Sequence, residues 1–217
     1  MKIYYLSLTS MEWSDTEDSL LKHVSLERQT RISKYYFASD QKLSLYAALL
    51  TRMAILKNTG LANEALLFSC EKNHKPVLAS NPHLDFSFSH TKNAILCCLS
   101  TKHQVGADIE LNKNAPFEIM SQVFHLNEIE YIYSDKSLQN KRFFEIWTRK
   151  EAYAKRNRTG LIGNLTAIDT LSHSSGCFYT WEEDSYICSV CSLESSTFQI
   201  TKTKRYFCLF RKSYLII

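Results

Sequence analysis

Two short segments carry side chains that could together bind a metal ion and a phosphate group. The first is Gly106-Ala-Asp-Ile-Glu110, and the second runs from Trp147 to Lys155. They supply the carboxylates of Asp108, Glu110 and Glu151 and the ammonium groups of Lys150 and Lys155. Mg²⁺ prefers hard oxygen ligands and completes its shell with water and phosphate oxygens. This set of groups could therefore hold a divalent metal ion and a polyphosphate at the same time.

The first segment lies in a stretch, 105–111, whose residues alternate as in a β-strand. Asp108 and Glu110 then project from one face of the strand. Two carboxylates on one face repel each other unless a cation lies between them. The small Gly106 beside them leaves room for a ligand to approach the backbone. An exposed strand face with two acids is the competing interpretation, and this motif alone does not decide between them.

The second segment lies in a predicted helix over 140–156. Trp147, Glu151 and Lys155 are spaced i, i+4 and i+8, so they lie along one side of that helix. A Glu–Lys pair at this spacing is common on exposed helices and contributes only about 0.2–0.5 kcal/mol. The aromatic Trp147 on the same side argues that this side is not simply surface.

Further groups that could bind phosphate are spread over the first half of the chain. Arg28 and Arg31 are neighbours on a predicted helix, Lys75 precedes a proline in a loop, and Ser89 and His90 follow a predicted strand. Taken singly, each is more often a solvated charge or a local hydrogen-bonding group. No Gly-x-Ser-x-Gly surrounds Ser89, which argues against a serine hydrolase.

The elements that must position these residues are a mixture of helices and short strands. Helices are predicted over 25–38, 40–57 and 140–156, with shorter ones after Pro116 and near 128–133. Strands are predicted at the N-terminus and over 86–89, 94–99, 105–111, 165–171, 178–181, 186–191, 198–201 and 205–210. The chain has no regular β-then-α alternation and no Gly-x-Gly-x-x-Gly, so a doubly wound sheet is not expected. We expect an α+β fold of two lobes, 1–103 and 104–217, with a linker near 100–104.

Composition narrows the class of protein. The formal net charge of +4 over 217 residues is mild and does not indicate a nucleic-acid-binding protein. No run of about 18 apolar residues predicts a membrane helix, and the N-terminus does not resemble a signal peptide, so the cytoplasm is the expected compartment. Cys188 and Cys191 have redox or zinc spacing, but a strand would direct them to opposite faces. Most of the seven cysteines lie in apolar runs, and we expect these to be buried free thiols.

Taken in chain order from Arg28 to Leu161, the candidate phosphate-binding and metal-binding residues resemble those of the 4′-phosphopantetheinyl transferases of the surfactin-synthetase-activating type. The specific signal is Gly-x-Asp-x-Glu followed by Trp-x-x-Lys-Glu-Ala-x-x-Lys. The resemblance implies two similar lobes related by a pseudo-two-fold axis, with coenzyme A and Mg²⁺ in the cleft between them. It implies transfer of phosphopantetheine to a serine of an acyl or peptidyl carrier protein, with release of 3′,5′-ADP.

The resemblance also implies a role for each candidate residue. Asp108, Glu110 and Glu151 fall at metal-ligand positions, and Lys150, Lys155 and His90 at phosphate-contacting positions. Ser89, Lys75, Arg28 and Arg31 fall at positions that hold the rest of the nucleotide, including its 3′-phosphate. Glu128 falls where some members carry an acid proposed to activate the attacking hydroxyl, so Glu128, Glu151 and Lys155 are the expected catalytic residues. A monomer is expected, and Lys113, Arg142 and Arg149 are candidates to contact an acidic carrier.

Two departures from the family pattern leave an alternative open. Leu43 stands where a basic residue is common, unless Lys42 or Arg52 replaces it, and the glycine-rich turn after Lys155 keeps only Gly160. The alternative is a non-catalytic module that binds coenzyme A or a carrier protein without transfer. A magnesium-dependent phosphohydrolase or nuclease is a third interpretation, but the sequence supplies neither a second acidic cluster nor a strongly basic groove for it.

Overall fold

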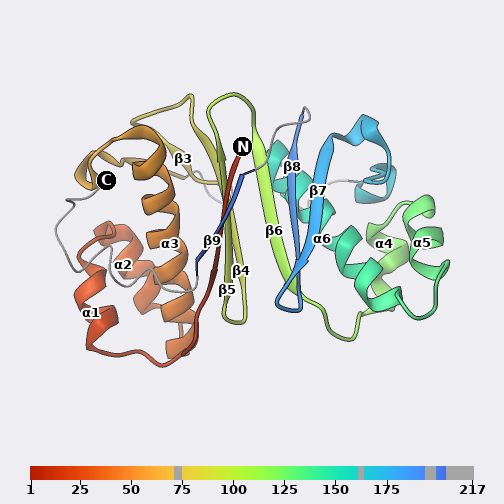
Figure 1. Ribbon diagram of the computed structural model, residues 1–217, viewed down its shortest axis with the longest axis horizontal. Coiled ribbons are helices and arrows are strands. Elements are labelled where there is room, and N and C mark those ends of the chain that lie inside the picture. The colour runs from red at the N-terminus through yellow and green to blue at the C-terminus, as the bar shows by residue number, and fades with distance from the viewer. Residues whose placement is uncertain (71–74, 161–163, 194–198, 204–217) are drawn as a thin grey trace.

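The protein has an α+β fold in which two β-sheets lie between two groups of helices (Figure 1). The structure is a computed structural model that describes residues 1–70, 75–160, 164–193 and 199–203. The first sheet has the order β4-β5-β1-β9, the second has the order β6-β8-β7, and β2 and β3 form a short ribbon. The α+β class expected from the sequence is confirmed.

The bounds of the elements are as follows. The helices are α1 (Asp15–Leu21), α2 (Leu26–Ser33), α3 (Ala38–Thr59), α4 (Met120–Val123), α5 (Leu126–Tyr133) and α6 (Gln139–Asn157). The strands are β1 (Lys2–Ser7), β2 (Phe68–Ser69), β3 (Val77–Leu78), β4 (Asp85–Thr91), β5 (Ala94–Ser100), β6 (Val105–Leu111), β7 (Cys177–Glu183), β8 (Tyr186–Ser192) and β9 (Gln199–Thr203). Short 3₁₀ turns lie at Asn63–Ala65, Phe117–Ile119, Leu165–Ala167 and His173–Ser175.

The first lobe is organised around α3, which packs along the first sheet. Every residue from Lys42 to Ile55 is buried, so α3 is a core helix rather than a surface helix. It ends at Gly60, whose φ of 70° is the left-handed conformation that terminates many helices. Ser25 caps α2 as predicted, but α2 ends at Ser33 instead of continuing to residue 38. In the next residues, Tyr36 and Phe37 are 91% and 62% exposed, so this segment has no buried apolar side to hold a longer helix.

The second lobe is organised by β6, whose two faces meet different partners. Ala107 and Ile109 enter the core between the two sheets, together with Tyr5 and Val190. Asp108 projects from the opposite face, which α6 covers, because its β8 partner Ser189 hydrogen-bonds a threonine of α6. The alternation predicted for this strand is therefore confirmed.

Gly106 has a different structural role from the one predicted. A Cβ atom at this position would lie 1.8 Å from the carbonyl oxygen of Ala152 and 2.7 Å from the amide nitrogen of Arg156. Both atoms belong to the backbone of α6, which cannot give way as a side chain can. The expectation that Gly106 makes room for a ligand was wrong, because the glycine lets α6 approach β6 closely.

The edge strands β4 and β6 join the two sheets through side chains. The amide of Ala107 donates to the hydroxyl of Ser87 at 3.1 Å, and the amide of Val105 donates to Asp85 at 2.7 Å. At the other side of the first sheet, β9 pairs in parallel with β1, so the later part of the chain returns to the first sheet. The junction of β4 and β6 brings residues from both lobes together.

One predicted strand was wrong, and one lies outside the described residues. Residues 165–171 begin with a 3₁₀ turn, and the carbonyl groups of Leu165 and Ile168 accept from Lys150 instead of from a neighbouring strand. The predicted strand over 205–210, which contains Cys208, falls outside the described part of the chain. Cys188 and Cys191 are buried free thiols, as predicted. Over the described residues, no helix is both long and apolar enough to cross a membrane.

Candidate active site

Asp108 is the centre of a cluster at the junction of β4, β6 and α6. Lys155 donates to its Oδ1 at 2.7 Å, and the hydroxyl of Ser89 donates to the same oxygen at 2.7 Å. Lys155 and Ser89 also lie 3.0 Å apart, so the three groups form a closed triangle. The second oxygen of Asp108, Oδ2, is buried and has no hydrogen-bond partner among the described residues. A buried carboxylate oxygen in this state favours a cation that the protein does not itself supply.

The charge of Asp108 acts on the other two predicted acids, Glu110 and Glu151. Burial, and then the charge of Asp108, raises the pKa of Glu110 to about 7, and Glu151 adds to this effect. Burial and Asp108 also raise the pKa of Glu151. Burial by itself would lower the pKa of Lys155, but the charges of Asp108, Glu151 and Glu110 outweigh it and hold that pKa above its usual value. The three carboxylates therefore repel one another, and Lys155 partly compensates them.

These residues fit a divalent cation in chemistry, although their side chains are not preassembled around one. Among the described residues, no group of three or more His, Cys, Asp or Glu side chains is arranged to hold a metal ion. Two observations favour a cation nonetheless: the unpartnered Oδ2 of Asp108, and the pKa of Glu110 and Glu151, which burial and then the charge of Asp108 raise. All three are oxygen donors, the type that Mg²⁺ prefers.

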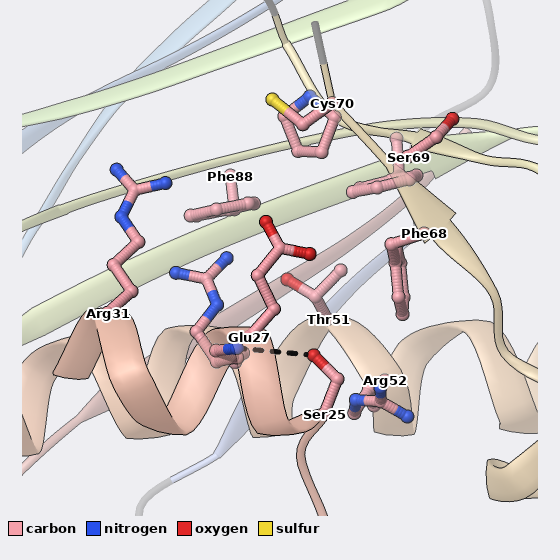
Figure 2. Close-up of a pocket in the computed structure, with 13 residues that line it drawn as sticks. Ser25, Glu27, Arg31, Thr51, Arg52, Phe68, Ser69, Cys70 and Phe88 are labelled. Carbon is pink, nitrogen blue, oxygen red and sulfur yellow. Dashed lines mark hydrogen bonds between the residues drawn. The ribbon is translucent and has the colours of Figure 1, made fainter. Parts of the chain in front are cut away.

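Two adjoining pockets extend from this cluster across the first lobe. The one nearer the cluster has a volume of about 210 Å³, and its lining includes Lys75, Lys155 and Arg158. The other, which we call the arginine pocket, has a volume of about 220 Å³ and is drawn in Figure 2. Its lining includes Arg28, Arg31 and Arg52. The pockets share Pro76, Phe86 and Phe88. Together they form a cleft with cations at both ends and an apolar middle.

Helix α2 supplies the two predicted arginines of the second pocket. Ser25 caps the helix through the amide of Arg28 at 3.3 Å, which sets where the helix begins. The guanidinium of Arg28 lies 5.9 Å from the centre of the Phe88 ring. Burial, and then the charge of Arg31, lowers the pKa of Arg28. In Figure 2, Arg31 extends from α2 on the same side as Phe88. A bound anion would offset the repulsion between two cations held this close.

His90 lies within electrostatic range of a cation at each end of the cleft. Burial, and then the charges of Lys155 and Arg28, lowers its pKa below the usual 6.5. These two cations belong to the Asp108 cluster and to the arginine pocket, respectively. The structure therefore brings together most of the predicted residues: Arg28, Arg31, Ser89, His90, Asp108, Glu110, Glu151 and Lys155.

Lys75 lies at the edge of the cleft and is already paired. Its ammonium group donates to Asp85 at 2.6 Å and to the carbonyl oxygen of Val105 at 2.7 Å. The same carboxylate accepts from Arg158 at 3.2 Å. Asp85 therefore holds two cations at the wall of the pocket. The sequence analysis missed Asp85 and Arg158, because one acid at a strand end and one arginine after a helix carry no recognisable motif.

The structure also separates the two residues considered as replacements at the Leu43 position. Lys42 is buried, pairs with Glu17 at 3.0 Å and donates to the carbonyl of Glu12. Arg52 instead lines the arginine pocket, where it lies 5.1 Å from the centre of the Phe68 ring. Arg52 is thus the basic residue of α3 that reaches the cleft.

Glu128 and Lys150 lie together in a buried site of their own. Lys150 pairs with Glu128 Oε2 at 2.7 Å, and that oxygen also accepts from the amide of His125. Oε1 of Glu128 accepts from both the amide and the hydroxyl of Thr170, at 2.8 and 2.6 Å. The structure does not bring this pair to the Asp108 cluster. Their predicted roles, as base and as phosphate ligand, stay predictions.

Two family models match consecutive parts of the chain. The model of the 4′-phosphopantetheinyl transferase superfamily matches residues 104–208, and that of the N-terminal part of a 4′-phosphopantetheinyl transferase matches residues 11–102. A 4′-phosphopantetheinyl transferase from Aneurinibacillus migulanus, gsp, is 31% identical over 202 residues, covering 85% of this chain and 83% of the relative. The Sfp protein of Bacillus subtilis, a 4′-phosphopantetheinyl transferase, is 25% identical over 177 residues, covering 81% and 79%.

The chain belongs to the 4′-phosphopantetheinyl transferase family. A more distant relative is the L-aminoadipate-semialdehyde dehydrogenase-phosphopantetheinyl transferase of the mouse, which is 27% identical over 156 residues, 65% of this chain and 50% of that protein. The activity of the family is the modification of a carrier protein with a group taken from coenzyme A.

In this phosphopantetheinyl transferase, both matched segments contribute to the cleft. The N-terminal match contains α2, α3 and β4, and with them the arginine pocket, Ser89 and His90. The other match contains β6 and α6, and with them the three acids and Lys155. The family assignment and the geometry thus point to the same part of the molecule.

Proposed function

We propose that the cleft between β4, β6 and α6 binds coenzyme A and one Mg²⁺ ion, and that the enzyme transfers 4′-phosphopantetheine to a serine of an acyl or peptidyl carrier protein. The other product would be 3′,5′-ADP. The observation that supports this most directly is the Asp108 cluster, where a buried carboxylate with one unpartnered oxygen lies against Lys155. Such a cluster can hold a cation and a phosphate side by side.

Arg28 and Arg31 are proposed to bind the nucleotide end of coenzyme A, including its 3′-phosphate. The support is the arginine pocket, where the two guanidinium groups lie close enough for Arg31 to lower the pKa of Arg28. Arg52 is proposed to contribute here in place of a basic residue at Leu43. Lys75 is proposed to border the nucleotide while it remains paired with Asp85.

Ser89, His90 and Lys155 are proposed to bind the diphosphate. Lys155 carries the charge, and its pKa stays above the usual value, so it is protonated at neutral pH. Preorganised cations of this kind stabilise charge that develops on the leaving phosphate, and they do so best when water is excluded. The hydroxyl of Ser89 orients both Lys155 and Asp108.

Asp108, Glu110 and Glu151 are the residues that would hold Mg²⁺. When bound there, the ion would neutralise and orient the reacting phosphate. The carboxylate of Asp108 offers its unpartnered Oδ2. Burial, and then the charge of Asp108, raises the pKa of both Glu110 and Glu151, and a nearby positive charge would offset these effects.

Glu128 and Lys150 are proposed to support the site from behind. Glu128 was predicted from the sequence to take the proton of the acceptor serine, and Lys150 to contact phosphate. Each side chain is buried and already makes hydrogen bonds within the protein, so neither is accessible to a substrate. Their pair ties α6 to α5 and to the segment around Thr170, and in this way fixes how α6 presents Glu151 and Lys155 to β6.

The acceptor is proposed to meet the enzyme at the rim of the cleft. Lys113 is exposed, and its charge acts on Glu110, which places it near the reacting groups. Arg142 and Arg149 are engaged with Tyr131 and Thr180, respectively. Lys113 is therefore the best supported of the three predicted contacts to an acidic carrier. The division into lobes at 103/104, a monomeric state and a cytoplasmic location remain part of the proposal.

The decisive experiment is mass spectrometry of apo carrier proteins incubated with coenzyme A, Mg²⁺ and the enzyme. We expect a phosphopantetheine adduct on at least one of several acyl and peptidyl carriers, and loss of this adduct with Asp108→Asn or Glu151→Gln. Glu130→Gln, an exposed acid on α5, is the matched control and should retain activity. If coenzyme A binds in a calorimeter while no carrier is ever modified, the protein is a binding module instead of an enzyme.

A further inference from the structure

Helix α6 ends at a residue whose backbone favours glycine. Arg158 has φ 60° and ψ 21°, the left-handed conformation, and its amide closes the helix on the carbonyl of Ala154. The corresponding position at the end of α3 is Gly60, with φ 70°. A residue with a Cβ atom is strained in this conformation, and such strain tends to occur where a side chain has a function. The left-handed conformation therefore makes the side chain of Arg158 a candidate for a functional role.

The guanidinium of Arg158 lies in the wall of the pocket nearer the Asp108 cluster. The cations in the lining of this pocket are Lys75, Lys155 and Arg158, and no Asp or Glu is among its described lining residues. Asp85, just behind the wall, accepts from Lys75 through Oδ2 and from Arg158 through Oδ1. Burial lowers the pKa of Lys75, and the charge of Arg158 adds to this lowering. One carboxylate thus faces two cations, and the pocket retains an excess of positive charge.

Arg158 is also placed to reach a ligand. Its side chain and that of Lys155 line the same pocket. Its side chain is 39% exposed, whereas that of Lys75 is 6% exposed. A guanidinium can donate to Asp85 and to a phosphate at once, because it has five N–H groups in a planar fork. The pocket also continues into the pocket of Arg28 and Arg31.

We propose that Arg158 binds a phosphate group of coenzyme A beside Lys155. It would be a substrate-binding residue at a position where the backbone favours glycine. The proposal rests on the proposed function only in naming coenzyme A as the ligand. The phosphate could belong to the diphosphate or to the 3′-position, since both are phosphate groups of one molecule.

The test uses the full-length enzyme with Arg158→Gly, Arg158→Lys and the control Lys92→Gly. Arg158→Gly removes the cation and relieves the backbone, so its melting temperature should not fall by more than the loss of one exposed ion pair explains. Lys92 is an exposed lysine with φ 51° that lines neither pocket, so Lys92→Gly makes the same two changes elsewhere. The measurements are calorimetric titrations with coenzyme A and with dephospho-coenzyme A, and steady-state kinetics with an apo carrier.

We expect Arg158→Gly to weaken coenzyme A binding by about 10- to 100-fold, the usual effect of removing a charged hydrogen-bond donor. KM for coenzyme A should rise while kcat changes little, Arg158→Lys should recover part of the affinity, and Lys92→Gly should behave as wild type. A loss that is equal for both ligands assigns Arg158 to the diphosphate, and a loss confined to coenzyme A assigns it to the 3′-phosphate.

Unchanged affinity of Arg158→Gly for coenzyme A would overturn the proposal and leave the Asp85 pair as a purely structural contact. An equal loss in Lys92→Gly would also overturn it, because the effect would then be one of net charge. If wild-type protein binds coenzyme A but modifies no carrier, the proposed function fails while the binding role of Arg158 is still measured.

Discussion

Helix α6 presents two lysine–carboxylate pairs that have the same length and different surroundings. Lys155 lies 2.7 Å from Asp108, and Lys150 lies 2.7 Å from Glu128. The side chain of Lys155 is 29% exposed, whereas that of Lys150 is 2% exposed. Five residues separate the two lysines, which places them about 140° apart around the helix. One pair faces β6 and the cleft, and the other faces α5.

The difference between the pairs lies in what remains unbonded. Both oxygens of Glu128 accept hydrogen bonds, from Lys150, His125 and Thr170. Asp108 keeps one buried oxygen without a partner among the described residues. A saturated buried pair cannot take a ligand without first losing bonds, and a broken one is costly. The unsaturated pair can take a ligand, so it is the one to which we assign chemistry.

Removing Lys155 should have the largest effect on phosphopantetheine transfer. Lys155→Met should lower the rate of phosphopantetheine transfer by about 10²- to 10³-fold, because a preorganised cation at the leaving phosphate is lost. The rate is measured by mass spectrometry of a carrier under single-turnover conditions. Retained transfer would show that Lys155 is not needed for the chemistry, and the two pairs would then differ only in exposure.

Removing Lys150 should affect the fold rather than the chemistry. Lys150→Met leaves the charge of Glu128 buried and unpaired, which typically costs about 3–5 kcal/mol of unfolding free energy. Urea denaturation measures the loss. The double variant Lys150→Met/Glu128→Gln should recover part of it, because the amide is uncharged and can still accept from Thr170. Lost transfer at unchanged stability would instead restore the phosphate-binding role predicted from the sequence.

A methyl group at Gly106 should disturb the unsaturated pair through the backbone. Gly106→Ala places a Cβ atom against the backbone of α6, and such overpacking costs about 1–3 kcal/mol or more. Because α6 must move away from β6, transfer by the folded fraction should fall as well. Gly60→Ala is the control: its Cβ would meet nothing within 4 Å, so it should lower stability through its φ alone and leave transfer intact. Equal transfer by the two variants would contradict this expectation.

The smallest expected effect is a pH dependence at His90. Burial, Lys155 and Arg28 lower its pKa, so the free enzyme carries a neutral imidazole at neutral pH. A bound phosphate would raise that pKa, so binding would take up a proton and strengthen as the pH falls through the range between the pKa of the bound enzyme and that of the free enzyme. In the free protein the sign is opposite for folding: with the folded pKa below 6.5, stability present above that value is lost as the pH falls.

Calorimetric titration with coenzyme A in buffers of different ionisation enthalpy measures how many protons the enzyme takes up on binding. Coenzyme A phosphates also titrate in this range, so the informative quantity is the difference between wild type and His90→Asn. An identical proton uptake in both proteins would show that His90 does not respond to the bound phosphate.

Much of the local structure followed from sequence patterns. The alternation over 105–111 predicted β6 and the shared face of Asp108 and Glu110, and the cap at Ser25 and the stop at Gly60 predicted where α2 begins and α3 ends. The segment 165–171 was misassigned because its carbonyl groups are bonded by Lys150, a residue distant in sequence. An apolar run does not reveal partners of that kind.

The family, the strand-borne acid pair and the helix that carries Glu151 and Lys155 were predictable from the amino-acid sequence, because each depends on residues close together in the chain. The tertiary structure decided which lysine of α6 faces Asp108 and which pairs with Glu128, why residue 106 must be glycine, and that Arg52 rather than Lys42 reaches the cleft. It also brought Arg158 beside Lys75. The physical reason is that helical spacing fixes the angle between two side chains, whereas only long-range packing fixes what lies opposite each of them.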